Sequence, residues 1–268
     1  MNLLCRRTFL KTASAVVGAS SAITAPTRVL ASPVLSDVCQ VGPFVCRATF
    51  SIGKEVDALN GLPELQRELQ RVLAVAPPKQ PIDIFLFGDQ TEYGNFLQEH
   101  FPEVPYRQAL FVRKNRQSSV YVYRQESLDI DLRHECTHAL LHSGLDVVPL
   151  WLDEGLAEYF EVAPEKRAFG HPHFRSLKWN MRLGMMRTID ALEQRSDLSE
   201  MDTYDYRFSW AWTHFMLHGP QAAYNELLAF LDAIRRGAVP GQLSGRLGLV
   251  MPDATEQMIR HFKHWRQA

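Results

Sequence analysis

Hydrophobic and polar positions follow strand-like and helix-like patterns in separate blocks of the chain. Residues 45–52, VCRATFSI, and residues 82–87, IDIFLF, are short and apolar, as expected of β-strands. Residues 59–76 and 91–101 instead carry apolar positions at helical spacing, and the first of these blocks ends before two prolines. The run ALFVRKNRQSSVYVYR predicts two strands that form a hairpin around the polar segment RKNRQSS.

From residue 129 onward the spacing of apolar residues is almost wholly helical. The pattern therefore predicts an α+β protein, with a small mixed β-sheet in residues 32–145 and an α-helical part in residues 146–268. A histidine-rich helix lies at the junction of the two parts. The length of 268 residues suits one large domain or two small ones, and no internal repeat is visible.

The first 31 residues differ from the rest, because they hold four basic residues and no acidic one. RRTFLK at residues 6–11 precedes a weakly apolar run rich in Ala, Ser and Gly, and VLA at residues 29–31 offers small residues for cleavage. This segment resembles a twin-arginine signal peptide, which implies passage through the twin-arginine translocon to a periplasmic or secreted location. A Sec-type signal and an amphipathic helix are the alternatives, but the apolar run is weakly hydrophobic for a Sec signal.

Removal of residues 1–31 leaves 25 of the 29 basic residues and all 30 acidic ones, so the remaining chain has a net charge of about −5. Such a chain lacks the basic stripe that nucleic-acid binding requires. No later apolar run reaches the ~18 residues of a membrane span. We therefore expect no nucleic-acid partner and no stable membrane anchor after signal cleavage.

Cys39 and Cys46 are seven positions apart in CQVGPFVC, with Gly42 and Pro43 between them. In an oxidising compartment this spacing allows a disulfide across a turn. The alternative is that both are free, small hydrophobic residues. Cys136 is left without a partner and is interpreted as a buried packing residue.

The segment RHECTHALLH, residues 133–142, contains several residues that could bind a metal ion or take part in catalysis. His134 and His138 are four positions apart, so one helix face can present both imidazoles to a single ion, about 6 Å apart along the axis. Glu135 lies beside them and can hold a water molecule instead of binding the ion. Zn²⁺ suits two imidazoles and a carboxylate, with a fourth position open for water. The motif is short enough to occur by chance, so a third ligand is needed.

WLDEGLAEYF, residues 151–160, follows this helix and resembles the glutamate helix of the gluzincin metallopeptidases. The resemblance covers about residues 120–220 and implies a single zincin-like peptidase domain over residues 32–268. It also implies that Glu154, 16 positions after His138, is the third zinc ligand. Glu158, one helical turn later, would then bond a ligand histidine and fix its tautomer. The reverse assignment, with Glu158 as the ligand, stays open.

The same resemblance points to an oxyanion donor and a substrate strand. Tyr206 is the first candidate for a donor that approaches the metal, and Tyr204 is the second. In zincins an edge strand beside the active-site helix holds the substrate backbone. Val120, Tyr121 and Val122 would supply those contacts here, unless they belong to an ordinary strand of the sheet.

Five further histidines are candidates for less direct roles. His142 lies too far along the helix, about 12 Å from His134, to bind the same ion, and is interpreted as a residue that supports the site or simply packs. The loop histidines His171 and His173 could line a cleft. His214 and His218 repeat the four-residue spacing without a nearby glutamate and are interpreted as structural.

Together these features predict an exported zinc metallopeptidase with a peptide or protein substrate. Zinc-activated water would attack the carbonyl, while Glu135 would act as the general base and return the proton to the leaving amine. One alternative is a catalytically inactive zinc-binding protein that acts as an assembly factor in the cell envelope. Another is an amidase that acts on a non-peptide envelope substrate.

Overall fold

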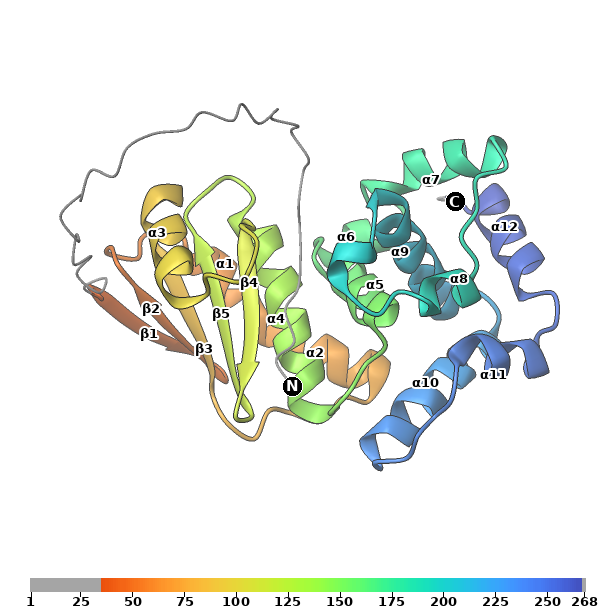
Figure 1. Cartoon of the computed structure of the whole chain (residues 1–268), viewed down its shortest axis with the longest axis horizontal. Helices are drawn as coiled ribbons and strands as arrows, with labels where there is room; N and C mark the ends of the chain where they lie inside the picture. Colours follow the sequence, from red (N-terminus) through yellow and green to blue (C-terminus); the bar gives the residue numbers. More distant parts are fainter. Residues whose placement is uncertain (1–34, 267–268) are drawn as a thin grey trace, which may run out of the picture.

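The structure, a computed structural model, describes residues 35–266. It consists of a five-stranded sheet with its helices, followed by a wholly helical part (Figure 1). The predicted export signal lies outside the described residues. The strands are β1 (Asp37–Val41), β2 (Phe44–Ala48), β3 (Ile82–Phe87), β4 (Ala109–Lys114) and β5 (Gln117–Tyr123).

The helices of the sheet part are α1 (Val56–Asn60), α2 (Leu62–Leu73), α3 (Gln90–His100) and α4 (Leu128–Gly144). The helical part holds α5 (Leu150–Phe160), α6 (Pro164–Arg167), α7 (His173–Arg182), α8 (Ile189–Glu193), the 3₁₀-helix η1 (Leu198–Glu200), α9 (Thr203–His218), α10 (Gln221–Arg235), α11 (Leu243–Val250) and α12 (Ala254–His264). This order confirms the predicted α+β class, with a small mixed sheet first and helices after it.

The sheet has the order β1-β2-β3-β5-β4. The central pairs β2–β3 and β3–β5 are parallel, whereas β1–β2 and β4–β5 are antiparallel hairpins. The predicted strand over residues 82–87 and the predicted hairpin around residues 114–117 are both present. The sequence reading missed β1, because DVCQV is short and only half apolar, and it extended the next strand beyond Ala48.

Cys39 and Cys46 face each other in this first hairpin, where they are register partners on β1 and β2. Both are free cysteines, so the disulfide considered from the sequence is absent from the structure. Directly opposed antiparallel residues keep their Cβ atoms about 4.5–5.5 Å apart, at or beyond the upper end of the roughly 3.5–4.5 Å that a disulfide spans. Burial, and next the neighbouring Cys39, raise the pKa of the Cys46 thiol to about 12.

Helices cover both faces of the sheet. One face packs against α4, with α1 and α2 beyond it, and its buried residues continue into the core of the helical part. The other face carries α3 and a separate aromatic cluster that includes Phe87, Tyr93 and Tyr123. The Asp89 side chain caps α3 by accepting from the backbone N–H groups of Thr91 and Glu92. Because the sheet packs on one side of α4 and the helical part on the other, α4 is buried between them.

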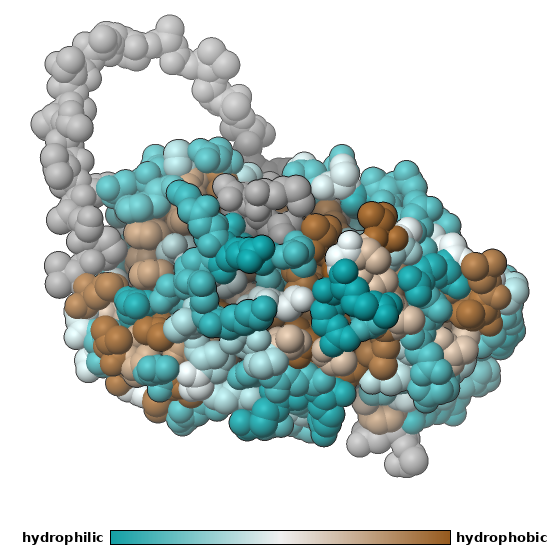
Figure 2. All heavy atoms as spheres, turned by 90° about the horizontal axis from the view of Figure 1, so that it is seen from below, coloured by the Kyte–Doolittle hydropathy of each residue, from teal (hydrophilic) through white to brown (hydrophobic). Residues whose placement is uncertain are grey.

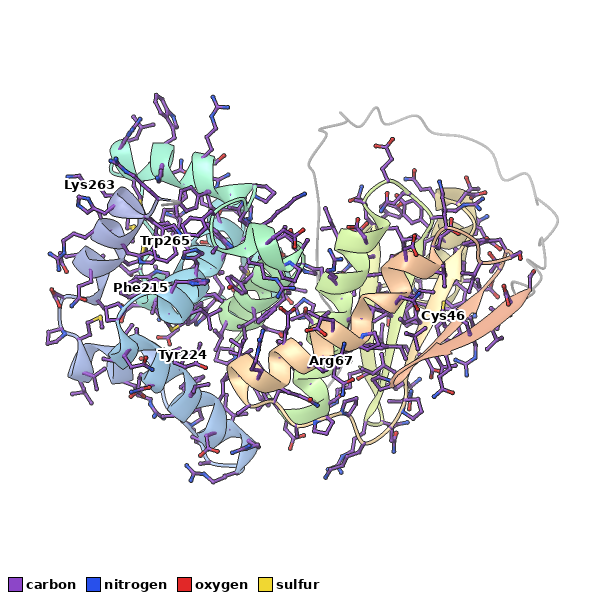
Figure 3. All side chains as sticks on the ribbon, turned by 180° about the vertical axis from the view of Figure 1, so that it is seen from behind. Cys46, Arg67, Phe215, Tyr224, Lys263 and Trp265 are labelled. Atoms are coloured by element: carbon purple, nitrogen blue, oxygen red, sulfur yellow. The ribbon has the colours of Figure 1, made fainter. Side chains whose placement is uncertain are left out.

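The two parts of the chain are joined by polar contacts as well as by the shared core. The Tyr224 hydroxyl on α10 donates to the backbone carbonyl of Val72 on α2, 2.7 Å away (Figure 3). The Arg167 guanidinium, which is buried, donates to the Glu68 carboxylate at 2.6 Å. These contacts fix the helical part against α2 and thereby fix α5 opposite α4.

The molecular surface carries hydrophilic groups over most of the face seen in Figure 2, with hydrophobic groups in separate patches. Among residues 35–266, none of the helices combines the length and the apolar character needed to cross a membrane.

Candidate metal centre

The helix α4 supplies three of the four residues at the centre of the candidate site. Almost every residue from Leu128 to His142 on this helix is buried or half-buried, because the sheet covers one side and α5 the other. His134, Glu135 and His138 are at most 2% exposed. Their burial is unusual for polar side chains and requires compensating partners.

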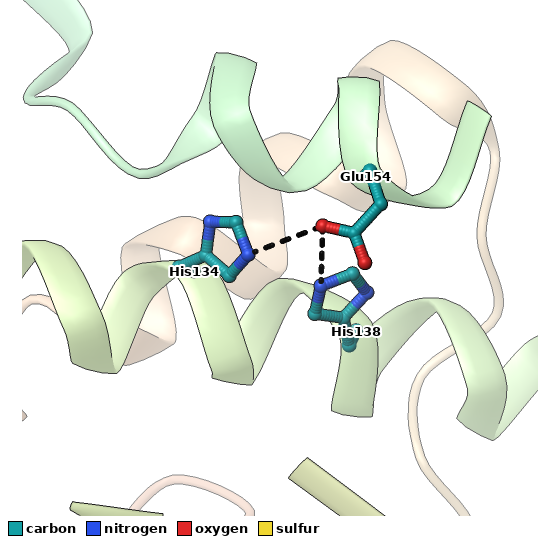
Figure 4. Close-up of side chains that lie close together, drawn as sticks. All are labelled: His134, His138 and Glu154. Atoms are coloured by element: carbon teal, nitrogen blue, oxygen red, sulfur yellow. Dashed lines mark ion pairs between the residues drawn. The ribbon is translucent and has the colours of Figure 1, made fainter. Parts of the chain in front are cut away.

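The helix α5 brings the third expected ligand to this face of α4. Glu154 Oε2 lies 3.6 Å from His134 Nε2 and 4.0 Å from His138 Nε2 (Figure 4). Ligand atoms at about 2.0–2.2 Å from a tetrahedral zinc ion stand about 3.3–3.5 Å from one another. The three side chains therefore fit zinc with only a small contraction, and they form one of three groups among the described residues that could hold a metal ion.

A close approach of α9 explains why a glycine follows Glu154. A Cβ atom at Gly155 would lie 2.5 Å from the Ser209 carbonyl oxygen and 2.6 Å from Thr213 Oγ1. No side chain fits in that space, so glycine lets α5 and α9 cross in direct contact. The crossing holds the first turns of α5, and with them Glu154, against α4.

Two acidic residues orient the ligand histidines through their other ring nitrogens. Asp153 Oδ1 lies 3.0 Å from His138 Nδ1, and Glu161 Oε2 lies 2.9 Å from His134 Nδ1. A carboxylate only accepts, so each Nδ1 carries the proton and each Nε2 is left with its lone pair toward Glu154. This is the tautomer that a metal ligand requires.

Asp153 also joins a third histidine to the site. Its second oxygen, Oδ2, lies 2.9 Å from His142 Nε2. The rings of His138 and His142 both stack on Phe111, with centroids 6.1 and 5.8 Å away. Burial alone would raise the pKa of Asp153, but His138 and His142 outweigh it and hold that pKa well below its usual range. His142 therefore supports Asp153. It belongs to a group with His138 and Asp153, and not to the group formed by His134, His138 and Glu154.

The charge of the site favours a cation. Burial opposes protonation of His138, yet Asp153 first and then Glu154 and Glu135 raise the pKa of His138 to about 9. The surrounding carboxylates are negative and buried, so a positive charge at this position stabilises them. A divalent ion held by His134 and His138 would supply that charge while the imidazoles stay neutral.

Glu135 is set apart from the ligand set. Burial raises the pKa of its carboxyl to about 7, although His138 and the buried Arg107 act in the opposite direction. The backbone N–H of Phe111 on β4 donates to the carboxylate, and Glu135 Oε2 has no hydrogen-bond partner among the described residues. A buried carboxyl with one free oxygen and a pKa near neutrality can accept and release a proton.

Glu158 lies near His134 but in a different group from the three expected ligands. Its carboxylate is close to His134 and Glu161, and Glu158 Oε2 lies 2.9 Å from His173 Nε2. His171, also buried, bonds the Glu158 backbone carbonyl at 2.8 Å. The contact to a ligand histidine that was expected from Glu158 is made instead by Glu161, which bonds His134, and by Asp153, which lies against His138.

The two tyrosine candidates for the oxyanion donor differ in their surroundings. Tyr206 lies in the first turns of α9, its ring is half-buried and its hydroxyl oxygen is inaccessible. Tyr206 shares the helix face of Ser209 and Thr213, which packs on Gly155. Tyr204 is 37% exposed and carries the Arg207 guanidinium over its ring. The arrangement favours Tyr206 over Tyr204.

The expected substrate strand requires a correction. Val120, Tyr121 and Val122 lie on β5, which pairs with β3 on one side and with β4 on the other. Their backbone groups are therefore engaged in the sheet, and Val120 and Val122 point into its core. The edge strands of the described sheet are β1 and β4, and β4 packs beside α4, where its Phe111 N–H reaches Glu135. The sequence could not show which strand of the β4–β5 hairpin lies at the edge of the sheet.

Asp153, Glu161 and Phe111 are site residues that the sequence reading missed. Asp153 had a signal in the motif, because it directly precedes Glu154 and starts a helix facing the histidines. Glu161 is seven positions after Glu154, which places it on the same face of the helix two turns later. Phe111 had no signal, because its proximity to Glu135 depends on the order of strands in the sheet.

His214 and His218 belong to a separate cluster in the helical part. His214 is buried, bonds the Ala168 carbonyl at 3.0 Å and lies 3.1 Å from His261 Nε2. His218 Nε2 lies 2.7 Å from the Tyr159 hydroxyl. The ring nitrogens of His214 are thus engaged in packing contacts, in line with a structural role.

Comparison with known proteins gives a match only at the level of structure. A scan of protein-family models finds no match, and no curated protein sequence matches either. The chain is similar to the crystal structure of an M1 zinc metallopeptidase from Deinococcus radiodurans, with 14% sequence identity and a TM-score of 0.43, and to a mutant of that enzyme with the same values. The match covers 87% of this chain and 52% of the length of that chain.

Proposed function

We propose that the protein is a zinc-dependent metallopeptidase that hydrolyses peptide bonds. The proposal rests on one observation above all: a buried carboxyl with a free oxygen, Glu135, stands beside three side chains spaced for one zinc ion. His134, His138 and Glu154 would hold the ion. Zinc bound there supplies a Lewis acid, which lowers the pKa of water and polarises a carbonyl.

Each residue has a defined part in the proposed reaction. Glu135 takes a proton from the attacking water through its free oxygen and delivers it to the leaving amine. Asp153 and Glu161 keep the imidazoles of His138 and His134 in the required tautomer. Tyr206 would donate its hydroxyl to the oxyanion as it forms.

Glu135→Gln tests the proposal because it removes the base and keeps the size of the side chain. We expect the variant to retain its fold and zinc content and to lose about 10²–10⁴-fold in turnover of an unstructured protein substrate. Glu135→Asp should also lose activity, since a shorter carboxylate misplaces the water. A zinc-loaded parent that hydrolyses no peptide library would instead favour the inactive zinc-binding protein, and hydrolysis of a non-peptide amide would favour the amidase.

We also propose that the protein is exported through the twin-arginine route to the periplasm or beyond. The support is the RRTFLK segment at residues 6–11. Arg6→Lys combined with Arg7→Lys should trap the protein in the cytoplasm, as measured by fractionation. Unchanged delivery in a strain that lacks the twin-arginine translocon would refute this route.

A further inference from the structure

An acid-free segment surrounds α7. Between Glu165 and Asp190 the chain has no acidic residue, and it has six basic ones. The rest of the chain does not share this bias, because the part after the predicted signal has a net charge of about −5. None of the residues assigned to the metal centre comes from α7 beyond its first residue, so the proposed reaction does not account for the bias.

The helix α7 separates a buried face from an exposed face. Leu177 and Asn180 are buried, and Phe174 and Met181 pack against the core. Three exposed residues of α7, Arg175, Trp179 and Arg182, and Leu183 directly after it lie at helical positions i, i+4, i+7 and i+8, and Ser176 is exposed beside Arg175. Trp179 is 60% exposed and Leu183 is 57% exposed. Two large apolar side chains thus project from one stripe that also carries two arginines.

Two more cations border this stripe. A surface hollow of about 780 Å³ is lined by residues of α7 and by Arg207 of α9. We define the α7 face as the exposed stripe with these flanking cations: Arg175, Lys178, Trp179, Arg182, Leu183 and Arg207. Arg207 NH1 donates to Asn180, and Lys178 lies over the Phe174 ring, so both are held in place by neutral partners. The ion pairs found within residues 35–266 include none of these four cations.

We propose that the α7 face docks reversibly on an anionic phospholipid surface. Lys and Arg near such a surface are attracted by its negative potential, with about a fivefold gain in binding for each cation. Tryptophan prefers the boundary between headgroups and acyl chains, where its apolar ring and its N–H are both accommodated. Leu183 beside Trp179 adds an apolar group that would be costly to leave in water.

The composition of the face argues against nucleic acid as the ligand. Single-stranded nucleic acid is bound by several aromatic side chains on which successive bases stack. The α7 face has one exposed tryptophan, and Leu183 offers no such stacking platform. The face instead suits a lipid surface, because its arginines can contact the headgroup phosphates while Trp179 and Leu183 contact the start of the acyl chains.

The helix that carries the α7 face also contacts a neighbour of the candidate site. The first residue of α7, His173, bonds Glu158, which lies beside His134. The α7 face is therefore linked to the surroundings of the candidate site through the first residue of its own helix. The docking proposal does not depend on catalysis, because the α7 face exists whether or not the site hydrolyses peptides.

A vesicle co-sedimentation assay tests the docking. The full chain is mixed with vesicles of phosphatidylcholine alone or of an equal mixture with phosphatidylglycerol. Parent and variants share the same N-terminal segment, so only differences between them are informative. Arg175→Gln with Arg182→Gln should reduce binding to the anionic vesicles about 25-fold, from about fivefold for each cation. Trp179→Ala should also weaken binding, and added salt should weaken the parent more than the double variant.

Matched controls remove the same groups elsewhere. Arg67→Gln with Arg71→Gln takes two exposed cations from α2, and Leu249→Ala shortens a side chain that is 86% exposed. Both controls should bind anionic vesicles like the parent, and circular dichroism should show all variants folded. Equal vesicle binding by the parent and the Arg175→Gln, Arg182→Gln variant would overturn the proposal. So would loss of single-stranded oligonucleotide binding in that variant with no loss of vesicle binding.

Discussion

At the scale of single residues, the site is organised by carboxylates that do not face the expected zinc position. Asp153 pairs with His138 through one oxygen and bonds His142 with the other, and Glu161 bonds His134. Each imidazole is thereby fixed in rotation and in tautomer before any ion binds. Loss of such an outer partner typically lowers metal affinity or activity about 10–100-fold.

Asp153→Ala should lower zinc affinity about 10–100-fold, because it frees His138 to rotate and leaves His142 Nε2 without an acceptor. Competition with a chromogenic chelator measures this change. Asp190→Ala, which removes an exposed carboxylate of α8, is the control and should bind zinc like the parent. Unchanged affinity in Asp153→Ala would contradict the orienting role.

Substitution of the two glutamates of α5 decides which one is the third ligand. Glu154→Ala should abolish stoichiometric zinc binding, because Glu154 Oε2 lies within 4.0 Å of both His134 Nε2 and His138 Nε2. Glu158→Ala should keep the ion, since Glu158 groups with His134 and Glu161 and not with His138. Elemental analysis of both variants after dialysis is the measurement, and the reverse pattern would make Glu158 the ligand.

At the scale of elements, the site depends on the crossing of α5 and α9. Gly155 permits that crossing, and it sits directly after Glu154 in the sequence. The requirement for glycine here is steric, because α9 backbone atoms occupy the space of a side chain. A larger side chain at position 155 would therefore push α5 away from α9 and displace the proposed ligand Glu154.

Gly155→Ala should lower the free energy of unfolding by about 1–3 kcal/mol, the usual cost of forcing extra volume into a packed contact. It should also weaken zinc binding, because α5 must move relative to α4. Thermal unfolding with and without chelator measures both effects. Gly245→Ala is the matched control: it lies in α11 with open space around it, so alanine there should be neutral or stabilise by up to about 1 kcal/mol.

At the scale of the whole molecule, a buried histidine cluster joins α9 to α12. His214 contacts His261 and Trp265, and the rings of His214 and His261 pack with Phe262. Burial, reinforced by neighbouring histidines, lowers the pKa of His214 to about 2, and burial lowers that of His261 to about 4. Both histidines are therefore neutral in the folded protein at neutral pH.

This cluster should make the helical part sensitive to acid. The folded pKa of His261 lies below its ordinary value of 6.5, so the unfolded chain binds more protons between these values. The contribution of neutral His261 to the free energy of unfolding is complete above about pH 6.5 and is lost as the pH falls toward about 4. Urea unfolding of the metal-free protein at pH 7 and at pH 4.5 measures the change. Between these two pH values, His261→Gln should lose less free energy of unfolding than the parent. His264→Gln, at an exposed position, should lose as much as the parent.

The sequence by itself determined much of this protein. Periodicity predicted the α+β class, β3 and the β4–β5 hairpin, because those segments have unambiguous apolar patterns. The histidine and glutamate motifs indicated which side chains to bring together, since i, i+4 spacing on a helix fixes His134 and His138 without any tertiary information. The order of strands, and hence the identity of the edge strand, was not encoded in any local pattern.

The tertiary structure decided the contacts between elements. Only the packing of α5 against α4 shows that Asp153 and Glu161 orient the histidines, and only the sheet order places Phe111 of β4 beside Glu135. The pKa of Glu135 likewise depends on its burial and on groups such as Arg107 and Phe111 from elsewhere in the chain, so it cannot be inferred from its neighbours in sequence. Local patterns specify which residues share a helix face. Partners from other elements are set by long-range packing, in which every element constrains the rest.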